Sequence, residues 1–238
     1  MDDKQRRTRP TTGNHLQRGL EAVKPDQPVS VRAGEPVAAP YKLRPLTEAD
    51  REAFIALVDK SLDHLSPWLP VLADGTSAEA FYEQERERSN EAERTGNAVR
   101  LIAECRGTIV GSFALTNITR GLCFQADASW WIGKPYLRRK YARRGLGLLL
   151  RRAFANAPDG LGLHRVMATI APDNEPSLRL AKAYGFARYE AQDHHLRLGD
   201  AWVRHHCFVA DAFEYAIREV KRPPRAETSV SLERETGT

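Results

Sequence analysis

Residues 134–157 read KPYLRRKYARRGLGLLLRRAFANA, a basic loop that runs directly into an amphipathic helix. The apolar residues Leu146, Leu149, Leu150 and Phe154 share one face of that helix, as expected for packing on a sheet. Between residues 134 and 152 the sequence holds eight cations and no acidic residue. They are Lys134, Arg138, Arg139, Lys140, Arg143, Arg144, Arg151 and Arg152. Such a cluster indicates either an anionic ligand or a solvated basic surface.

An anion would meet this segment at the predicted start of the helix, where residues 143–147 read RRGLG. A helix N-terminus presents unpaired backbone N–H groups and the positive end of the helix dipole. Gly145 and Gly147 would let a diphosphate approach that backbone without an intervening Cβ. Taken alone the pattern is weak, because glycines are common at helix starts and basic runs commonly cover solvated faces.

The segments on either side of the helix predict strands. Before it, three segments are rich in β-formers, and Arg106-Gly107 separates the first two as a hairpin turn. They are VRLIAEC (99–105), TIVGSFALTNI (108–118) and ADASWWIG (126–133). After it come the strand HRVMATIAP (164–172) and the helix PSLRLAKAYGF (176–186), which ends at Gly185. Two final strands, 187–198 and 201–210, flank Gly199-Asp200 as a two-residue turn.

The N-terminal part of the core begins with YKLRPLTEAD, residues 41–50. This predicts a short strand followed by a helix, with Thr47 and Asp50 forming a capping box. A second helix is predicted from Ser77 to about Arg94. The resulting order is strand, two helices, three strands, helix, strand, helix and two strands. It predicts an α+β fold with helices on the faces of a mixed sheet.

Composition limits the class of protein. The 238 residues include 36 Lys and Arg and 31 Asp and Glu, so the net charge is 36 − 31 = +5, and 42% of residues are hydrophobic. These values exclude collagen-like, coiled-coil and wholly disordered chains. We expect one domain over 41–216, with disordered tails at 1–40 and 217–238. The sequence contains no apolar run typical of a membrane span or signal peptide, so we expect a cytoplasmic protein. Three cysteines without CxxC spacing favour neither a disulfide framework nor a structural zinc site.

From ASWWIG through RRKYARRGLG to NEPSLRLAKAYGF, the sequence resembles the GNAT N-acetyltransferase superfamily. It is most similar to the RimJ/RimL-type branch, which acetylates the N-termini of ribosomal proteins, and the resemblance covers residues 41–212. It implies a mostly antiparallel twisted sheet, with a splayed strand pair at the acetyl-CoA site. In that family, the splayed strand, here Trp131, Ile132 and Gly133, pairs with the pantetheine amides. The loop then cradles the pyrophosphate, here through Arg143, Arg144, Gly145, Leu146 and Gly147, and Asn174 and Ser177 open the next helix.

The sequence departs from the family pattern at two positions. Ala142 stands where the loop usually carries Gln or Arg, so Arg139 and Lys140 are expected, with Arg143 and Arg144, to replace the lost contact. Ala181 stands where many members carry a Tyr that protonates the leaving thiolate. The ribosomal-protein branch often lacks this Tyr, so we expect Ser177 to supply the proton, directly or through water.

Acetyl transfer to an amine requires a proton acceptor, because an ammonium has no lone pair with which to attack. Asp127 matches a position where relatives of this branch often carry Glu, and an apolar wall from Trp130 or Trp131 would raise its pKa. The alternative is a carboxylate on the wet face of an edge strand. Glu104 is a weaker candidate. The oxyanion would be stabilised by backbone N–H groups near Ile132.

For the acceptor amine, the resemblance places Trp68 of HLSPWLP and one histidine of the last hairpin, His195, beside the substrate. The pairs His194-His195 and His205-His206 are otherwise structural. Neighbours in a strand face opposite ways, so at most two of the four imidazoles converge, and we expect no metal site.

Three functions remain in competition. The first is an acetyl-CoA-dependent acyltransferase acting on an α-amine, that of a ribosomal or other protein N-terminus, by direct attack through a tetrahedral intermediate. The second has the same donor and a small amine as acceptor, such as an antibiotic, polyamine or amino acid. The third is a basic module that binds ribosomal RNA. Weak ribosome association is compatible with the first, no membrane partner is expected, and monomer and homodimer are equally consistent with the sequence.

Overall fold

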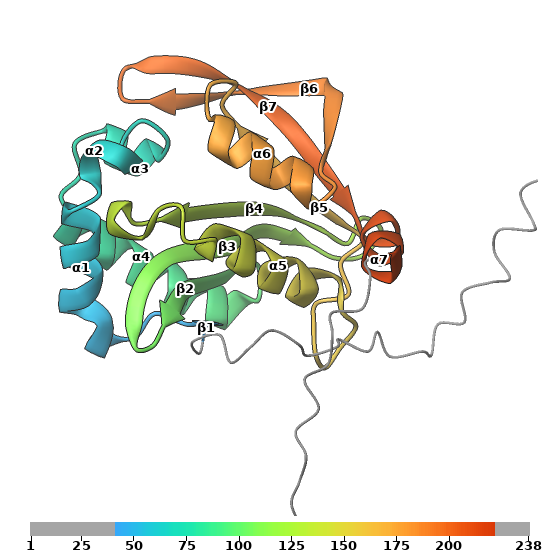
Figure 1. Cartoon of the computed structure of the whole chain (residues 1–238), viewed down its shortest axis with the longest axis horizontal. Coiled ribbons are helices and arrows are strands. Elements are labelled where there is room, and N and C mark those ends of the chain that lie inside the picture. Colours follow the sequence, from blue (N-terminus) through green and yellow to red (C-terminus); the bar gives the residue numbers. More distant parts are fainter. Residues whose placement is uncertain (1–40, 222–238) are drawn as a thin grey trace, which may run out of the picture. The chain divides into compact units, whose positions relative to one another are not determined.

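The computed structural model describes residues 41–221, whose strands form one seven-stranded sheet in the order β1-β2-β3-β4-β5-β7-β6 (Figure 1). The strands are β1 (Tyr41–Arg44), β2 (Val99–Cys105), β3 (Thr108–Thr119), β4 (Gln125–Ile132), β5 (Arg165–Ile170), β6 (Ala187–Leu198) and β7 (Ala201–Asp211). Neighbouring strands pair antiparallel except β4 and β5, which are parallel. The predicted mixed, mostly antiparallel sheet is therefore confirmed.

Helices cover both faces of this sheet. They are α1 (Arg51–Asp59), α2 (Leu62–Leu65), α3 (Pro70–Ala73), α4 (Ala78–Thr95), α5 (Tyr141–Phe154), α6 (Glu175–Ala183) and α7 (Ala212–Lys221), with 3₁₀ turns η1 (Glu48–Asp50) and η2 (Lys134–Tyr136). Figure 1 shows α5 and α6 on the near side of the sheet. Residues of α5 and α6 share one apolar core with the sheet, and residues of α1 and α4 share a second core on the opposite face.

The alternation of strand residues separates these two cores. On β4, Ala128 and Ile132 belong to the core under α5, whereas Trp131 packs against Phe54 of α1, with ring centroids 5.8 Å apart. Leu146, Leu149 and Leu150 of α5 are fully buried, as the spacing of the apolar residues predicts. We call the two sides of the sheet the α5 face and the α1 face.

The split between β4 and β5 is the feature that positions the site. The two strands pair at only three positions, from Gln125 with Arg165 to Asp127 with Met167. Beyond these, β4 continues along β3 as far as Ile132, whereas β5 continues along β7 as far as Ile170. The carboxyl-terminal halves of the two parallel strands therefore diverge and leave a gap in the middle of the sheet.

Local signals are confirmed at several positions. Thr47 and Asp50 form the predicted capping box, and Ser77 caps α4. Gly185 and Gly199 adopt the left-handed conformation at the end of α6 and in the last hairpin, with φ of 83° and 58°.

The structure differs from the prediction in its short helices and at its C-terminal end. Between the two helices predicted for the N-terminal part of the core, the chain folds into the short helices α2 and α3. The tail predicted from residue 217 begins inside α7, which continues to Lys221 because Tyr215 packs on Phe154, with ring centroids 5.2 Å apart. Residues 1–40 and 222–238, where the rest of the predicted tails lies, are outside the described residues.

Candidate active site

A cavity of about 740 Å³ occupies the gap between the diverging strands. Its walls include residues 128–132 of β4 and residues 168–171 at the end of β5. On the α5 face it is bounded by the first turns of α5 and α6. On the α1 face it is bounded by α2, the loop to α3, and the β6–β7 hairpin. Because it has walls from both faces, two ligands can meet inside the sheet.

The β4 wall presents backbone groups to this cavity. Gly133 donates its N–H to the Val110 carbonyl of β3 (3.0 Å), so the backbone groups of odd-numbered β4 residues point toward β3. By the alternation of a strand, the N–H groups of Trp130 and Ile132 point to the other edge, which β5 has left after the Asp127–Met167 pair. An extended chain with its own amides can pair there as a strand would. Trp131 and Ile132 line the cavity, as predicted.

Gly133 has a packing role. It lies outside the cavity lining, and a Cβ on it would come within 2.3 Å of the Leu57 side chain. The absence of a side chain therefore lets α1 lie against the end of β4.

The first turn of α5 carries the anion-binding features. Arg138 and Lys140 both have positive φ, 60° and 62°, immediately before the helix begins at Tyr141. The first intrahelical bond is from Arg144 N–H to the Lys140 carbonyl, so the N–H groups of Tyr141, Ala142 and Arg143 have no partner within the helix. Leu137, Arg138 and residues 140–143 line the cavity. This turn combines free donors, the helix dipole and cationic side chains, which is the chemistry that binds a diphosphate.

Gly145 and Gly147 lie one turn further into α5 than the sequence predicted, and neither lines the cavity. A Cβ on Gly145 would lie 2.1–2.7 Å from ring atoms of Phe113, and one on Gly147 would lie 2.7 Å from the Tyr184 hydroxyl. That hydroxyl donates to the Arg143 carbonyl (2.5 Å). Leu146 is buried in the core. The interpretation that these glycines admit the anion is therefore corrected: they let α5 approach β3 and α6.

Two further arginines of the basic run also lie outside the cavity lining. Arg144 stacks on the ring of Tyr41, 4.8 Å from its centroid, and Arg139 lies 5.9 Å from the centroid of Tyr136. Both side chains therefore cover aromatic surface, and Lys140 and Arg143 are the predicted cations that the structure brings to the cavity.

The first turn of α6 supplies the opposite wall. The Asn174 side chain caps this helix by accepting a hydrogen bond from the Ser177 N–H (3.2 Å). Asn174 and Ser177, two of the predicted site residues, both line the cavity. Because α5 and α6 follow the carboxyl ends of parallel neighbouring strands, their N-termini meet at the same edge of the gap.

Asp127 lies at the vertex of the split and outside the cavity lining. It occupies the last paired position of β4 with β5, and its carboxylate accepts a hydrogen bond from the Asn117 side chain (2.7 Å). Glu104 lies on β2, away from the split, and forms ion pairs with Lys42 and Arg44 of the neighbouring strand β1. Neither predicted carboxylate is thus brought to the cavity.

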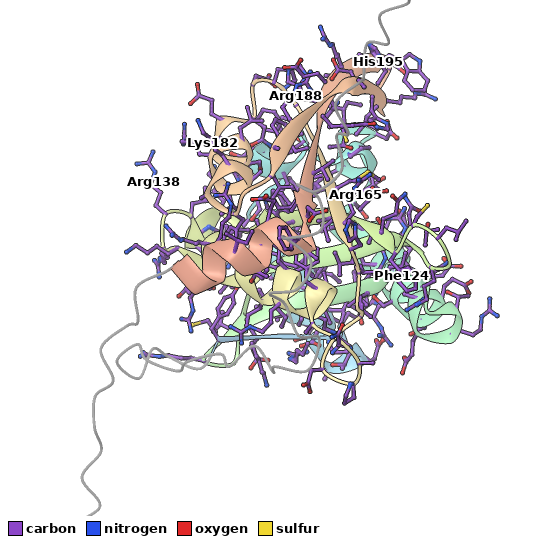
Figure 2. All side chains as sticks on the ribbon, turned by 90° about the vertical axis from the view of Figure 1, so that its right-hand side faces the viewer. Phe124, Arg138, Arg165, Lys182, Arg188 and His195 are labelled. Atoms are coloured by element: carbon purple, nitrogen blue, oxygen red, sulfur yellow. The ribbon has the colours of Figure 1, made fainter. Side chains whose placement is uncertain are left out.

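The acceptor side of the cavity contains Trp68, as predicted, with Leu65, Leu69 and Leu196. His195 does not line it. Figure 2 shows His195 at the outer end of the β6–β7 hairpin, well separated from Arg138. His195 is exposed and pairs with Arg204, whereas its neighbour His194 pairs with His205 on the other side of the hairpin. His205 is the histidine of this hairpin that reaches the cavity.

Two imidazoles that the sequence did not single out line the cavity, those of His64 and His205. Burial lowers the pKa of His64, while Asp63 and a hydrogen bond to the Ile132 carbonyl oppose that shift in part. For His205, the available signal was the alternation of strand residues, but only the strand register shows which histidine faces inward.

Comparison with known proteins identifies the family. Residues 41–187 match the family model described as acetyltransferase (GNAT) domain, which spans more than half of the chain. The chain belongs to the GNAT acetyltransferase family. A comparison with curated protein sequences finds no significant match.

The GNAT fold is also seen in solved structures. The chain is similar to Mycobacterium smegmatis RimJ in complex with CoA-disulfide, with 24% identity and a TM-score of 0.66, covering 76% of this chain and 88% of that chain. It is similar to RimL, the ribosomal L7/L12 α-N-protein acetyltransferase, with 18% identity and a TM-score of 0.63, covering 74% of this chain and 96% of that chain. It is also similar to a SpeG chimera of Vibrio cholerae spermidine N-acetyltransferase and hSSAT. The identity is 18% and the TM-score 0.58, covering 76% of this chain and 99% of that chain.

Membership of this family makes the protein an acyltransferase that takes its acetyl group from acetyl-CoA. The cavity fits this donor, because free N–H groups on α5 suit a pyrophosphate and the open edge of β4 suits an amide chain. Within the described residues, no three His, Cys, Asp or Glu side chains gather to hold a metal ion. No helix among them is long and apolar enough to cross a membrane.

Proposed function

We propose that this GNAT acetyltransferase transfers acetyl from acetyl-CoA to the α-amine of a protein N-terminus, with ribosomal proteins as the substrate class. The observation that carries the proposal is the chemistry of the acceptor wall. Among the described residues that line the cavity there is no Asp or Glu. A polyamine or aminoglycoside carries several positive charges and needs carboxylates to hold them, whereas a peptide N-terminus presents one amine on a neutral backbone.

The protonation state of the amine also favours an α-amine. Its ordinary pKa is about 7.7–8.0, compared with about 10.4 for an alkyl ammonium such as that of lysine. Near neutral pH, an appreciable fraction of α-amines is already uncharged. An apolar wall of Trp68, Leu65, Leu69 and Leu196 favours that uncharged form, because burial without a counter-ion disfavours a cation.

In this proposal the donor lies on the α5 face and the acceptor on the α1 face. Lys140, Arg143 and the N–H groups of the first turn of α5 bind the pyrophosphate. The N–H groups of Trp130 and Ile132 hold the pantetheine chain, and the Ile132 N–H is the donor nearest the end of the strand for the thioester oxygen. The amine attacks the thioester carbon directly through a tetrahedral intermediate, and the Ser177 hydroxyl protonates the departing thiolate.

The test is a competition among acceptors. The protein is incubated with acetyl-CoA and, in parallel, with peptides that copy ribosomal-protein N-termini, the same peptides with blocked α-amines, spermidine and free alanine. Products are identified by mass spectrometry. We expect acetylation of free α-amines of peptides alone. Acetylation of spermidine, or of a blocked peptide on a lysine, with no α-acetylation, would contradict the proposal and return the chain to the small-amine or side-chain class.

The same peptides define the role of Trp68. Trp68→Ala should raise KM for the peptide while leaving the dissociation constant of acetyl-CoA unchanged, because Trp68 lies on the acceptor wall. Equal loss of both affinities would indicate a structural role instead.

A further inference from the structure

The catalysed reaction needs a proton acceptor that can reach the amine, and carboxylates are absent from the described lining of the cavity. The side chains there that carry a proton-accepting lone pair near neutral pH are the imidazoles of His64 and His205. His64 lies on α2, beside the Ile132 end of β4. His205 lies on β7, on the other wall of the split, and is 3% exposed.

The hydrogen bonding of His205 fixes its tautomer. Its Nδ1 lies 2.8 Å from the backbone carbonyl oxygen of Val203. A carbonyl can only accept, so Nδ1 carries the proton and, in the neutral ring, Nε2 carries the lone pair. This is the arrangement by which proteins orient an imidazole that must accept a proton.

The register of β7 places His205 beside the end of β5. The last pair of the β5–β7 ladder is Ile170 with His206, so His205 lies beside the turn in which residue 171 lines the cavity. Alternation puts His205 on the α1 face together with Leu196 of β6 and with Trp131 across the split. This is the face that carries the acceptor wall.

Within residues 41–221 His205 forms no ion pair. The charged side chains that line the same cavity are Arg138, Lys140, Arg143 and Arg179. The cross-strand partner of His205 on β6 is His194, and the titratable group that faces the cavity from α2 is His64. Cys207 follows on the same face of β7. Burial raises the pKa of its thiol, and the Asp127 carboxylate of β4 adds to that rise. The charged cluster of Arg188, Asp193, Arg204 and His206 lies on the opposite face of the hairpin.

We propose that His205 is the general base of this acetyltransferase, with Nε2 accepting the proton of the attacking amine directly or through one water. The amine nitrogen forms the bond to the acetyl carbon, and its proton passes to Nε2. The C–S bond then breaks, and its electron pair leaves with sulfur, which takes a proton from the Ser177 hydroxyl. Ser177 regains a proton from solvent, and the imidazolium returns its proton to solvent. The inference rests on the proposed function for its acceptor but not for its geometry.

The experiment compares full-length wild type with His205→Gln, His205→Ala and the control His164→Gln. His164 is an exposed histidine before β5, outside the cavity lining, whose ring lies 3.4 Å from the Asp211 carboxylate and whose side chain is 61% exposed. Acetyl transfer to a peptide α-amine, transfer to spermidine, and hydrolysis of acetyl-CoA by water are each measured as functions of pH. Acetyl-CoA affinity and Tm are measured for every variant, and imidazole is added to His205→Ala.

We expect His205→Gln to lower kcat by about 10²–10⁴-fold while acetyl-CoA affinity and Tm stay near wild type. In wild type, kcat should fall in acid more than protonation of the peptide α-amine alone requires, because a protonated ring cannot accept a proton. His205→Gln should keep only the part of that fall that comes from the α-amine, whose ordinary pKa is about 7.7–8.0. Imidazole should restore activity to His205→Ala and leave His164→Gln unchanged.

The outcomes separate this inference from the proposed acceptor. If the peptide is not acetylated but acetyl-CoA hydrolysis or transfer to spermidine still depends on His205, the proposed acceptor is wrong and the assignment of His205 as the base is supported. Wild-type activity and an unchanged pH profile in His205→Gln would contradict the assignment of His205 as the general base. So would a loss in His205→Gln and His205→Ala that comes with loss of acetyl-CoA binding and no rescue by imidazole. A wild type that turns over none of the three would overturn both inferences.

Discussion

Gly145 meets Phe113 where α5 crosses β3, and a Cβ at this position would lie 2.1–2.7 Å from three ring atoms. The ring is fully buried, so it cannot move away without disturbing the core. We therefore expect Gly145→Ala to destabilise the protein by about 1–3 kcal/mol, despite the better helix propensity of alanine. Thermal unfolding should show a Tm lower by several degrees.

The control is Gly147→Ala on the same helix, where the Cβ would meet the Tyr184 hydroxyl at 2.7 Å. The end of a tyrosine side chain can shift, so this substitution should cost less than Gly145→Ala. A Tm for Gly145→Ala at or above that of wild type would show that α5 is not held against Phe113 in this way.

Asp50 is the acceptor in a local network with Arg44. The Arg44 guanidinium donates to both carboxylate oxygens at 2.7 Å, and the Thr47 N–H and hydroxyl donate at 2.8 and 2.7 Å. The Arg44 guanidinium holds the pKa of Asp50 well below its ordinary value, with the Thr47 donors contributing. The network therefore stabilises the fold fully above the unfolded-state pKa of about 3.9 and progressively less as pH falls below it.

Asp50→Asn should remove about 2 kcal/mol at neutral pH and flatten the loss of stability in acid, because the amide cannot titrate. Urea unfolding of both proteins between neutral pH and about pH 3 measures this. Asp59→Asn, at an exposed carboxylate at the end of α1, is the control and should behave as wild type. Parallel pH curves for wild type and Asp50→Asn would refute the assignment.

These residues show what a sequence reveals at this scale. The capping box of Thr47 and Asp50 was predictable, because both partners lie within one turn of chain. The choice of His205 over His195 was not, because it depends on how β6 and β7 pair and on which face of the hairpin meets a cavity. The role of Gly145 was also hidden, because its contact is 32 residues away in sequence, on another element.

The first turn of α5 is the element that binds the phosphates in our proposal. Arg143 lies in this turn and lines the cavity, so its charge can be reversed as a test. Arg143→Glu should weaken acetyl-CoA binding by about 10–100-fold, since a charge-assisted hydrogen bond is replaced by repulsion. Arg152→Glu, at the exposed end of the same helix and outside the cavity, is the matched control.

Calorimetry at two salt concentrations measures both variants. The affinity of wild type should fall with added salt, and that of Arg143→Glu should depend on salt less, because an attractive contact with the phosphates is lost. Equal affinities for Arg143→Glu and Arg152→Glu would mean that the basic run acts as a diffuse surface and not through the first turn of α5.

Element length explains which helices were predictable. The 18 residues of α4 and the 14 of α5 give several turns in which an apolar face can be recognised. The four residues each of α2 and α3 complete about one turn, which is too short for periodicity to show. Residues 217–221, the second half of α7, fall in the predicted tail because the sequence beyond them is polar, whereas the contact of Tyr215 with Phe154 is visible only in the folded chain.

For the whole molecule, the order of elements predicted the fold class, and the split in the sheet was predictable only through the resemblance to a family. No local pattern shows that β4 leaves β5 after three pairs, since each strand keeps a partner on its other side. That split is nonetheless what gives the sheet two walls and the cavity an opening toward each face. Donor and acceptor can then approach the same point from opposite faces.

This arrangement predicts the order of chemical events. Because each substrate has its own wall, acetyl-CoA and the acceptor can be bound together, and the described cavity lining holds no cysteine to carry an acetyl group between them. Initial rates measured over both substrate concentrations should therefore give intersecting double-reciprocal lines. Intact mass spectrometry of the protein with acetyl-CoA alone should detect no covalent acetyl adduct. Parallel lines with a chemically competent acetyl-enzyme, for example on Ser177, would instead require that the two walls serve successive half-reactions.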